Sequence, residues 1–86
     1  MTNAESVRTA LARDLPNGTP LATVLDYLDK AKVEHSGFVP KEALVGAIWR
    51  DVARNGPVTQ SVKADFHFDA DGKLVAMMVK DQFTGP

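Results

Sequence analysis

Histidine can act as an acid, a base or a metal ligand, and this sequence contains two, His35 and His67. His35 lies between Glu34 and Ser36, which are residue types found in hydrolase triads. A base of that kind needs a group that orients its ring, and nothing around Ser36 resembles the turn that exposes a serine nucleophile. The segment therefore favours a polar loop, with a hydrolase or a small-ligand site at His35 as the weaker alternative.

His67 alternates with Asp65 and Asp69 along one segment. Neighbours at this spacing on one strand face supply few ligands to a metal ion, so the pattern favours a solvated strand. Residues 69–72 begin like a calcium loop, but Leu74 and the residues after it do not supply the later oxygen ligands. Asp-Gly is instead typical of a hairpin turn. We expect no catalytic residue, no metal site and no cofactor.

A different kind of chemistry is indicated by the single tryptophan. Trp49 is followed by Arg50, and Arg54 comes four residues later. Trp and Arg are the residue types that most often anchor protein interfaces. Tyr27 and Phe38 could extend the same patch, so these five residues form the candidate protein-binding surface. In the alternative interpretation, Trp49 belongs to the core and Arg50 is solvated on the opposite face.

The segment from Val58 to Phe83 predicts a β-hairpin that the rest of the chain must support. Apolar residues alternate with polar ones along its first strand, at Val62, Ala64, Phe66 and Phe68. A second apolar run follows the Asp-Gly turn. Because a lone hairpin is marginal in water, another element must cover the Phe66 side.

Two helices are predicted before this hairpin, at about residues 3–15 and 20–32. Thr2 to Glu5 fits a capping box with Thr2 as the N-cap. Thr19 is the expected N-cap of the second helix, and Pro20 suits its first position. Apolar residues then recur at helical spacing, at Leu21, Val24, Leu25 and Leu28.

Lys41 to Arg54 fits two interpretations. Leu44, Ile48 and Val52 have helical spacing, and the following Asn-Gly-Pro would end a helix. Two strands alone, however, make a poor platform for two helices, and a third completes a viable sheet. We therefore predict strands at about residues 43–54, 58–69 and 73–83.

The chain of 86 residues is long enough for one domain, residues 1–86, with a modest core. We predict an α+β fold in which two N-terminal helices pack on a three-stranded antiparallel β-meander. The expected core residues are Val7, Leu11, Leu21, Val24, Leu25, Leu28, Ile48, Val62, Phe66, Phe68 and Met77.

Composition excludes several classes of function. The net charge is −1 and the basic residues form no run, so we expect no nucleic-acid partner. The absence of cysteine excludes disulfides, thiolate metal sites and a cysteine nucleophile. No apolar run is long enough to span a membrane. As written, the sequence predicts a cytoplasmic protein; a trimmed N-terminus would allow a periplasmic or envelope location.

The order of these motifs resembles a known family. A helix beginning at Gly18-Thr19-Pro20, a connector and a closing Phe66-x-Phe68-Asp69-x-x-Gly72-x-Leu74 look like the small BamE (SmpA/OmlA) domain. They are also similar to the repeats of β-lactamase inhibitory proteins. The resemblance spans about residues 18–79, without the lipid-anchoring cysteine of BamE. It implies two helices on a three-stranded meander, a scaffold usually used for protein–protein contact.

Together these observations predict a non-enzymatic protein-binding module with a protein partner, such as an envelope assembly factor or inhibitor in bacteria. The alternative is a small cytoplasmic regulator or immunity-type protein that occludes the active site of its partner.

Overall fold

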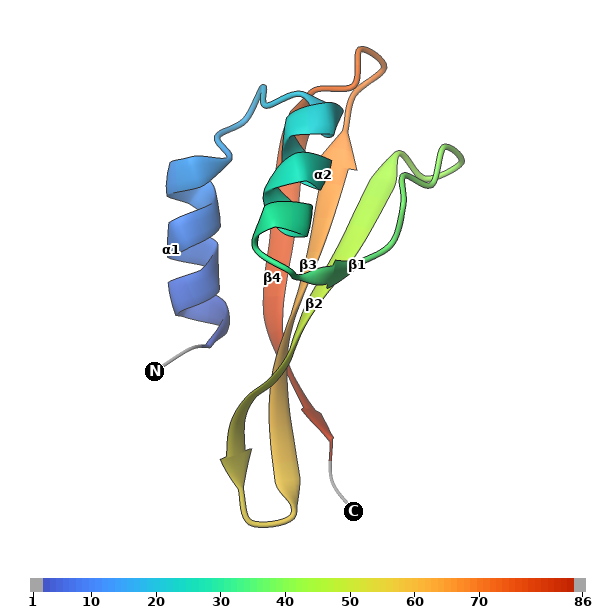
Figure 1. Cartoon of the computed structure of the whole chain (residues 1–86). Coiled ribbons are helices and arrows are strands. Elements are labelled where there is room, and N and C mark those ends of the chain that lie inside the picture. The colour runs from blue at the N-terminus through green and yellow to red at the C-terminus, as the bar shows by residue number, and fades with distance from the viewer. Residues whose placement is uncertain (1–2, 85–86) are drawn as a thin grey trace.

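The computed structural model describes residues 3–84, apart from the side chains of residues 51–55 and 84. Helices α1 (Ala4–Asp14) and α2 (Leu21–Lys30) come first. Strands β1 (Glu34–His35), β2 (Leu44–Asn55), β3 (Val58–Phe68) and β4 (Leu74–Thr84) follow. The strands form one antiparallel sheet in the order β1-β2-β3-β4, and both helices lie on the same face of it (Figure 1). The predicted α+β class is confirmed.

The sheet has four strands in the described residues, so the prediction of three was wrong by one. Glu34 and His35 pair with Ile48 and Ala47 inside the predicted connector. Ser36 N–H then donates to the Gly46 carbonyl at 2.8 Å. These contacts pair the backbone of β2 at Gly46, Ala47 and Ile48 on the side away from β3. A strand of two residues has no alternating pattern, so only the edge that it covers reveals it.

The helix starts differ from the predicted caps. Asn3 is the N-cap of α1: its side chain accepts from Ser6 N–H and the Ser6 hydroxyl accepts from Asn3 N–H, both at 2.9 Å. Thr2, the predicted cap, lies outside the described residues. Pro20 is the N-cap of α2 and has no capping side chain. The Thr19 hydroxyl instead donates to the Pro16 carbonyl at 2.5 Å, which closes the turn between the helices.

Of the two interpretations of Lys41 to Arg54, the strand is correct, because β2 runs from Leu44 to Asn55. The Asn-Gly-Pro sequence that would end a helix forms the turn of the β2–β3 hairpin, because Asn55 pairs with Val58. Gly56 occupies the first position of this two-residue loop with a φ of 61°, as a type II′ turn requires. The register shifts between Trp49 and Ala53, which marks a bulge in β2.

The core lies between the two helices and the part of the sheet that is farther from the Gly56–Pro57 turn. Most of the predicted core residues are buried there, namely Val7, Leu11, Val24, Leu28, Val62, Phe66 and Phe68. Leu21, Leu25 and Met77 pack partly buried at its margin. Leu15, Val45 and Leu74 are fully buried although they were not predicted.

Ile48 was wrongly assigned to the core. It pairs with Lys63, whose side chain points away from the helices, whereas its neighbours Ala47 and Trp49 pair with the buried Ala64 and Val62. The predicted strand has apolar residues on both of its faces, so the sequence did not show which face is buried. In a strand, residues two and four apart share a face, and for Leu44 and Ile48 that face is the one without helices.

The sheet is longer than the layer of helices. Beyond the ends of α1 and α2 it continues toward the Gly56–Pro57 turn as a bare ribbon, here called the projecting end (residues 53–60 and 82–84) (Figure 1). The molecule is accordingly elongated, with extents of 44 × 26 × 20 Å. None of the helices in the described residues is long and apolar enough to cross a membrane.

Candidate protein-binding surface

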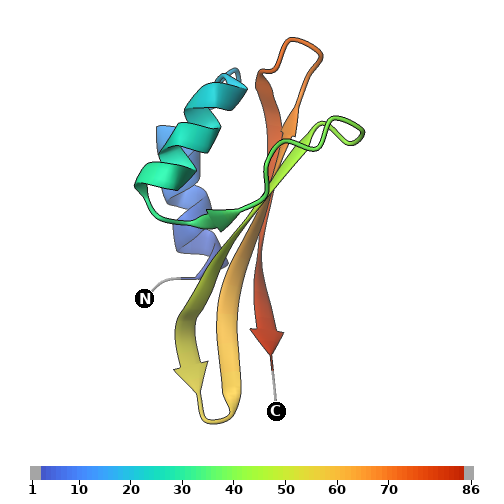
Figure 2. The ribbon, with the colours of Figure 1, turned by 45° about the vertical axis from the view of Figure 1, so that its right-hand side comes forward.

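One face of the sheet has no helix on it in the described part of the chain (Figure 2). By the strand register, the residues on this helix-free face include Glu34, Leu44, Gly46, Ile48, Lys63, Asp65, His67, Ala76, Met78 and Lys80. Apolar, acidic and basic side chains are therefore interleaved across it.

Its apolar residues remain partly accessible. Leu44 and Ile48 are half-buried on β2, and Met78 on β4 is 65% exposed. A methionine side chain is flexible and polarisable, so it adapts to the shape of a partner. These residues give the helix-free face apolar area that binding could remove from water.

Charged residues surround this apolar area. Arg50 forms an ion pair with Glu34 across β1 and β2. Lys63 and Lys80 lie directly opposite each other on β3 and β4. A shallow groove of about 540 Å³ runs between these groups and is lined by Ser36, Ile48, Arg50, Lys63 and Gln82, among others.

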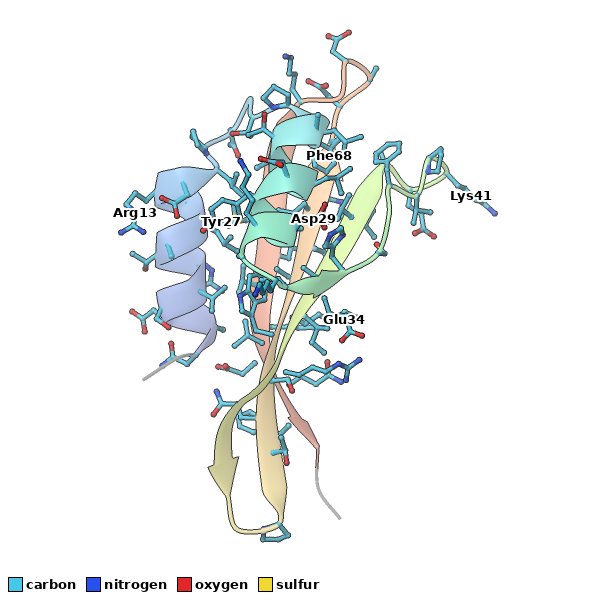
Figure 3. All side chains as sticks on the ribbon, viewed as in Figure 1. Arg13, Tyr27, Asp29, Glu34, Lys41 and Phe68 are labelled. Carbon is cyan, nitrogen blue, oxygen red and sulfur yellow. The ribbon has the colours of Figure 1, made fainter. Side chains whose placement is uncertain are left out.

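Trp49 and Arg50 lie on opposite faces of β2. Trp49 is half-buried and packs against the core on the helix side. Arg50 is exposed and forms an ion pair with Glu34, which lies on the helix-free face (Glu34 is labelled in Figure 3). The backbone of Arg54 pairs with Thr59, but its side chain lies outside the described residues. The structure thus separates the tryptophan from the arginine that follows it.

Tyr27 and Phe38 also lie on the helix side. Tyr27 is half-buried between the two helices, and its hydroxyl donates to Asp14 at 2.8 Å (Figure 3). Burial and this hydrogen bond raise the pKa of Tyr27. Phe38 packs edge-on against the core residue Phe68, with ring centroids 6.1 Å apart. The predicted patch is therefore not continuous: Arg50 alone of its described side chains faces the helix-free side.

His35 has the orienting carboxylate that the sequence could not reveal. Its Nε2 lies 2.6 Å from Asp29 Oδ1 on the side of α2 that faces β1, and its Nδ1 lies 2.7 Å from the Ser36 carbonyl (Figure 3). Both partners only accept hydrogen bonds, so satisfying both requires the doubly protonated ring. The hydrogen bond to Asp29, followed by that to Ser36, raises the pKa of His35.

These contacts leave no imidazole nitrogen for a substrate proton. The Ser36 hydroxyl is also engaged, since it donates to the Gly37 carbonyl and accepts from Gly46 N–H. Glu34 pairs with Arg50 rather than with His35. The arrangement is suited to joining α2 to the sheet edge rather than to moving a proton.

The acidic turn before β4 is explained by its own hydrogen bonds. Asp69 Oδ1 accepts from the backbone N–H groups of Asp71 and Lys73, each at 2.9 Å, and Gly72 has a φ of 75°. These are the contacts of an Asx turn. Among the described residues, no group of three or more acidic or histidine side chains is arranged to hold a metal ion.

The signal that the sequence analysis left unused was the polar half of the alternating pattern. Lys63 and His67 belong to this polar half, but the residues that pair with them on β4 can be identified only from the strand register.

Comparisons with family models, curated proteins and solved structures gave no match.

Proposed function

We propose that this protein is a non-enzymatic protein-binding module and that the helix-free face of its sheet is the binding surface. The observation that carries the proposal is the accessible apolar area of Ile48 and Met78, set among charged groups on a regular sheet face. A sheet holds such side chains at fixed spacing, which limits the entropy lost on binding.

An envelope assembly factor or inhibitor is the role that we propose first. The elongated shape supports it, because a sheet longer than its helices offers an extended surface to a large partner. A regulator or immunity-type protein would use the same face to occlude an active site. The two roles differ in the partner and not in the surface.

The proposal can be tested by affinity capture from a lysate of the source organism with matched charge variants. Met78→Glu places a carboxylate on the helix-free face, and Thr23→Glu places the same charge on the exposed side of α2. We expect a stoichiometric partner that the wild type and Thr23→Glu retain and Met78→Glu loses. A partner retained equally by both variants, or no partner at all, would contradict the proposal.

Arg50→Ala provides a second probe of the same face. Its loss removes the ion pair with Glu34 without creating a cavity, since Arg50 is exposed. Trp49→Ala is unsuitable as a binding probe, because Trp49 packs against the core and its truncation would also lower stability.

A further inference from the structure

We propose that the helix-free face binds an acidic segment of a partner protein, with carboxylates at Lys63 and Lys80 and apolar side chains at Ile48 and Met78. This inference rests on the proposed function, because it names the kind of partner that the same surface takes.

The two lysines carry the charge argument. Lys63 and Lys80 are exposed and directly opposed across the β3–β4 ladder. Cross-strand partners have their Cβ atoms about 5 Å apart, so like charges there destabilise the pair. Within the described part of the chain, neither lysine forms an ion pair with an acidic side chain. Carboxylates from a partner would replace this repulsion with attraction.

Further hydrogen-bond donors lie beside the lysines. The Gln82 side chain and the Arg50 guanidinium line the same groove as Lys63. Amide and guanidinium N–H groups are suitable donors to carboxylates. Arg50 is already paired with Glu34, so Lys63 and the Gln82 amide are the donors that this groove offers to an acidic group.

The apolar residues indicate a protein segment rather than an isolated anion. Ile48 is the register partner of Lys63, and Met78 comes two residues before Lys80 on the same face. A bound segment would therefore cover apolar and cationic side chains together. An extended peptide with acidic and apolar residues on one side matches this arrangement.

Nucleic acid and anionic membranes fit the same surface less well. Glu34 and Asp65 lie on the helix-free face near the lysines, and the whole chain has a net charge of −1. A uniformly charged polyanion would meet these carboxylates as well as the lysines. A peptide can place its charges selectively.

The direct test is an NMR titration of the ¹⁵N-labelled full chain with a peptide of repeated Glu-Ser-Val-Ser, whose glutamates and valines share one side when extended. The matched control peptide carries lysine in place of glutamate. We expect amide shifts around Ile48, Lys63, Met78 and Lys80 with the acidic peptide alone, and these should weaken as salt is added.

Three results, from this titration or from the same measurement with other ligands or with protein alone, would overturn the inference. Shifts confined to the helices, or no shifts at all, would remove the site. Tighter binding of oligo-dT or of phosphatidylglycerol vesicles to the same residues would identify a polyanion surface. Shifts of the same residues with protein concentration alone would identify a second copy of this chain as the occupant.

Charge reversal tests the lysines themselves. Lys63→Glu/Lys80→Glu should weaken acidic-peptide binding about tenfold or more, because two attractive contacts become repulsive. Lys41→Glu/Lys73→Glu has the same net charge and changes exposed positions elsewhere, with Lys41 on the loop before β2 (Figure 3). An equal loss in both would show a general charge effect and overturn the inference. Lys63→Gln, a milder change, should still weaken binding about threefold.

The same variants separate this inference from the proposed function. If Met78→Glu loses the captured partner and Lys63→Glu/Lys80→Glu retains it, the helix-free face is a binding surface but the partner is not acidic. If Met78→Glu retains every partner, the proposed function is wrong, whatever the peptide does.

Discussion

Phe66 and Phe83 are the same residue type on neighbouring strands of one sheet, yet Phe66 is fully buried and Phe83 is 64% exposed. The difference follows from the lengths of the elements. An eleven-residue helix such as α1 is about 16 Å long, whereas an eleven-residue strand such as β4 is about 36 Å long. Helices of this length cannot cover the full length of the sheet, so its uncovered part becomes the projecting end.

The largest expected effect separates these two regions directly. Phe66→Ala should lower the free energy of unfolding by about 3–5 kcal/mol, because it leaves a cavity under the helices. Phe83→Ala should change it by less than about 0.5 kcal/mol. Urea denaturation of the two variants measures both values. Equal losses would show that the projecting end is packed against something in solution.

Hydrogen exchange tests the same difference without mutation. Amides in the covered part of β3, at Ala64 and Phe66, should exchange only on global unfolding. The amide of Gln60 in the projecting end should exchange by local opening, with a lower apparent free energy. NMR-detected exchange over a range of denaturant concentrations distinguishes the two. Uniform protection along β3 would contradict the comparison.

Asp81 lies between the two regions and joins both. Its Oδ1 accepts from Ala4 N–H at the start of α1 at 2.9 Å and from the Gln60 side chain at 2.7 Å. Asp81→Ala should cost about 1 kcal/mol, because a helix N-terminus loses an acidic partner. Thermal or urea unfolding measures this loss. Gln60→Ala is the control, and its effect should be smaller.

The smallest change in stability that we expect to measure concerns pH. The pKa of His35 is raised by Asp29 in the folded state, so its contribution to stability is present below the unfolded pKa of about 6.5. It is lost as pH rises through the higher folded pKa. Urea unfolding from about pH 5.5 to 8.5 should therefore show a decline of about 0.5 kcal/mol that His35→Gln lacks. A wild type and a variant with the same pH dependence would contradict the linkage.

Local patterns predicted most of the fold. The alternation from Val62 to Phe68 identified a strand and its buried side, and helical spacing identified Val24 and Leu28 as core. The apolar spacing of Leu44 to Asn55 favours a helix, but the segment forms a strand. The strand was predicted because a viable sheet needs a third strand. The two-residue strand β1 was missed because pairing, not side-chain pattern, defines it.

Prediction of the candidate site was limited by the need to know which residues face each other. Trp49 and Arg50 are adjacent in sequence but lie on opposite faces once the segment is a strand. Lys63 and Lys80 are distant in sequence but opposed in the sheet. The orienting partner of His35, Asp29, lies on α2 and is likewise brought close only by tertiary structure.

The contacts of α1 have a consequence for how the chain is made. This first helix packs mainly on β4, the last strand, and is tied to it where Arg8 donates to the Val79 carbonyl at 2.6 Å. During synthesis on the ribosome, α1 emerges first but finds its packing surface only after residues 74–84 have left the exit tunnel. Short isolated helices are marginal in water. We therefore expect that α1 acquires stable structure only after translation of the domain is complete.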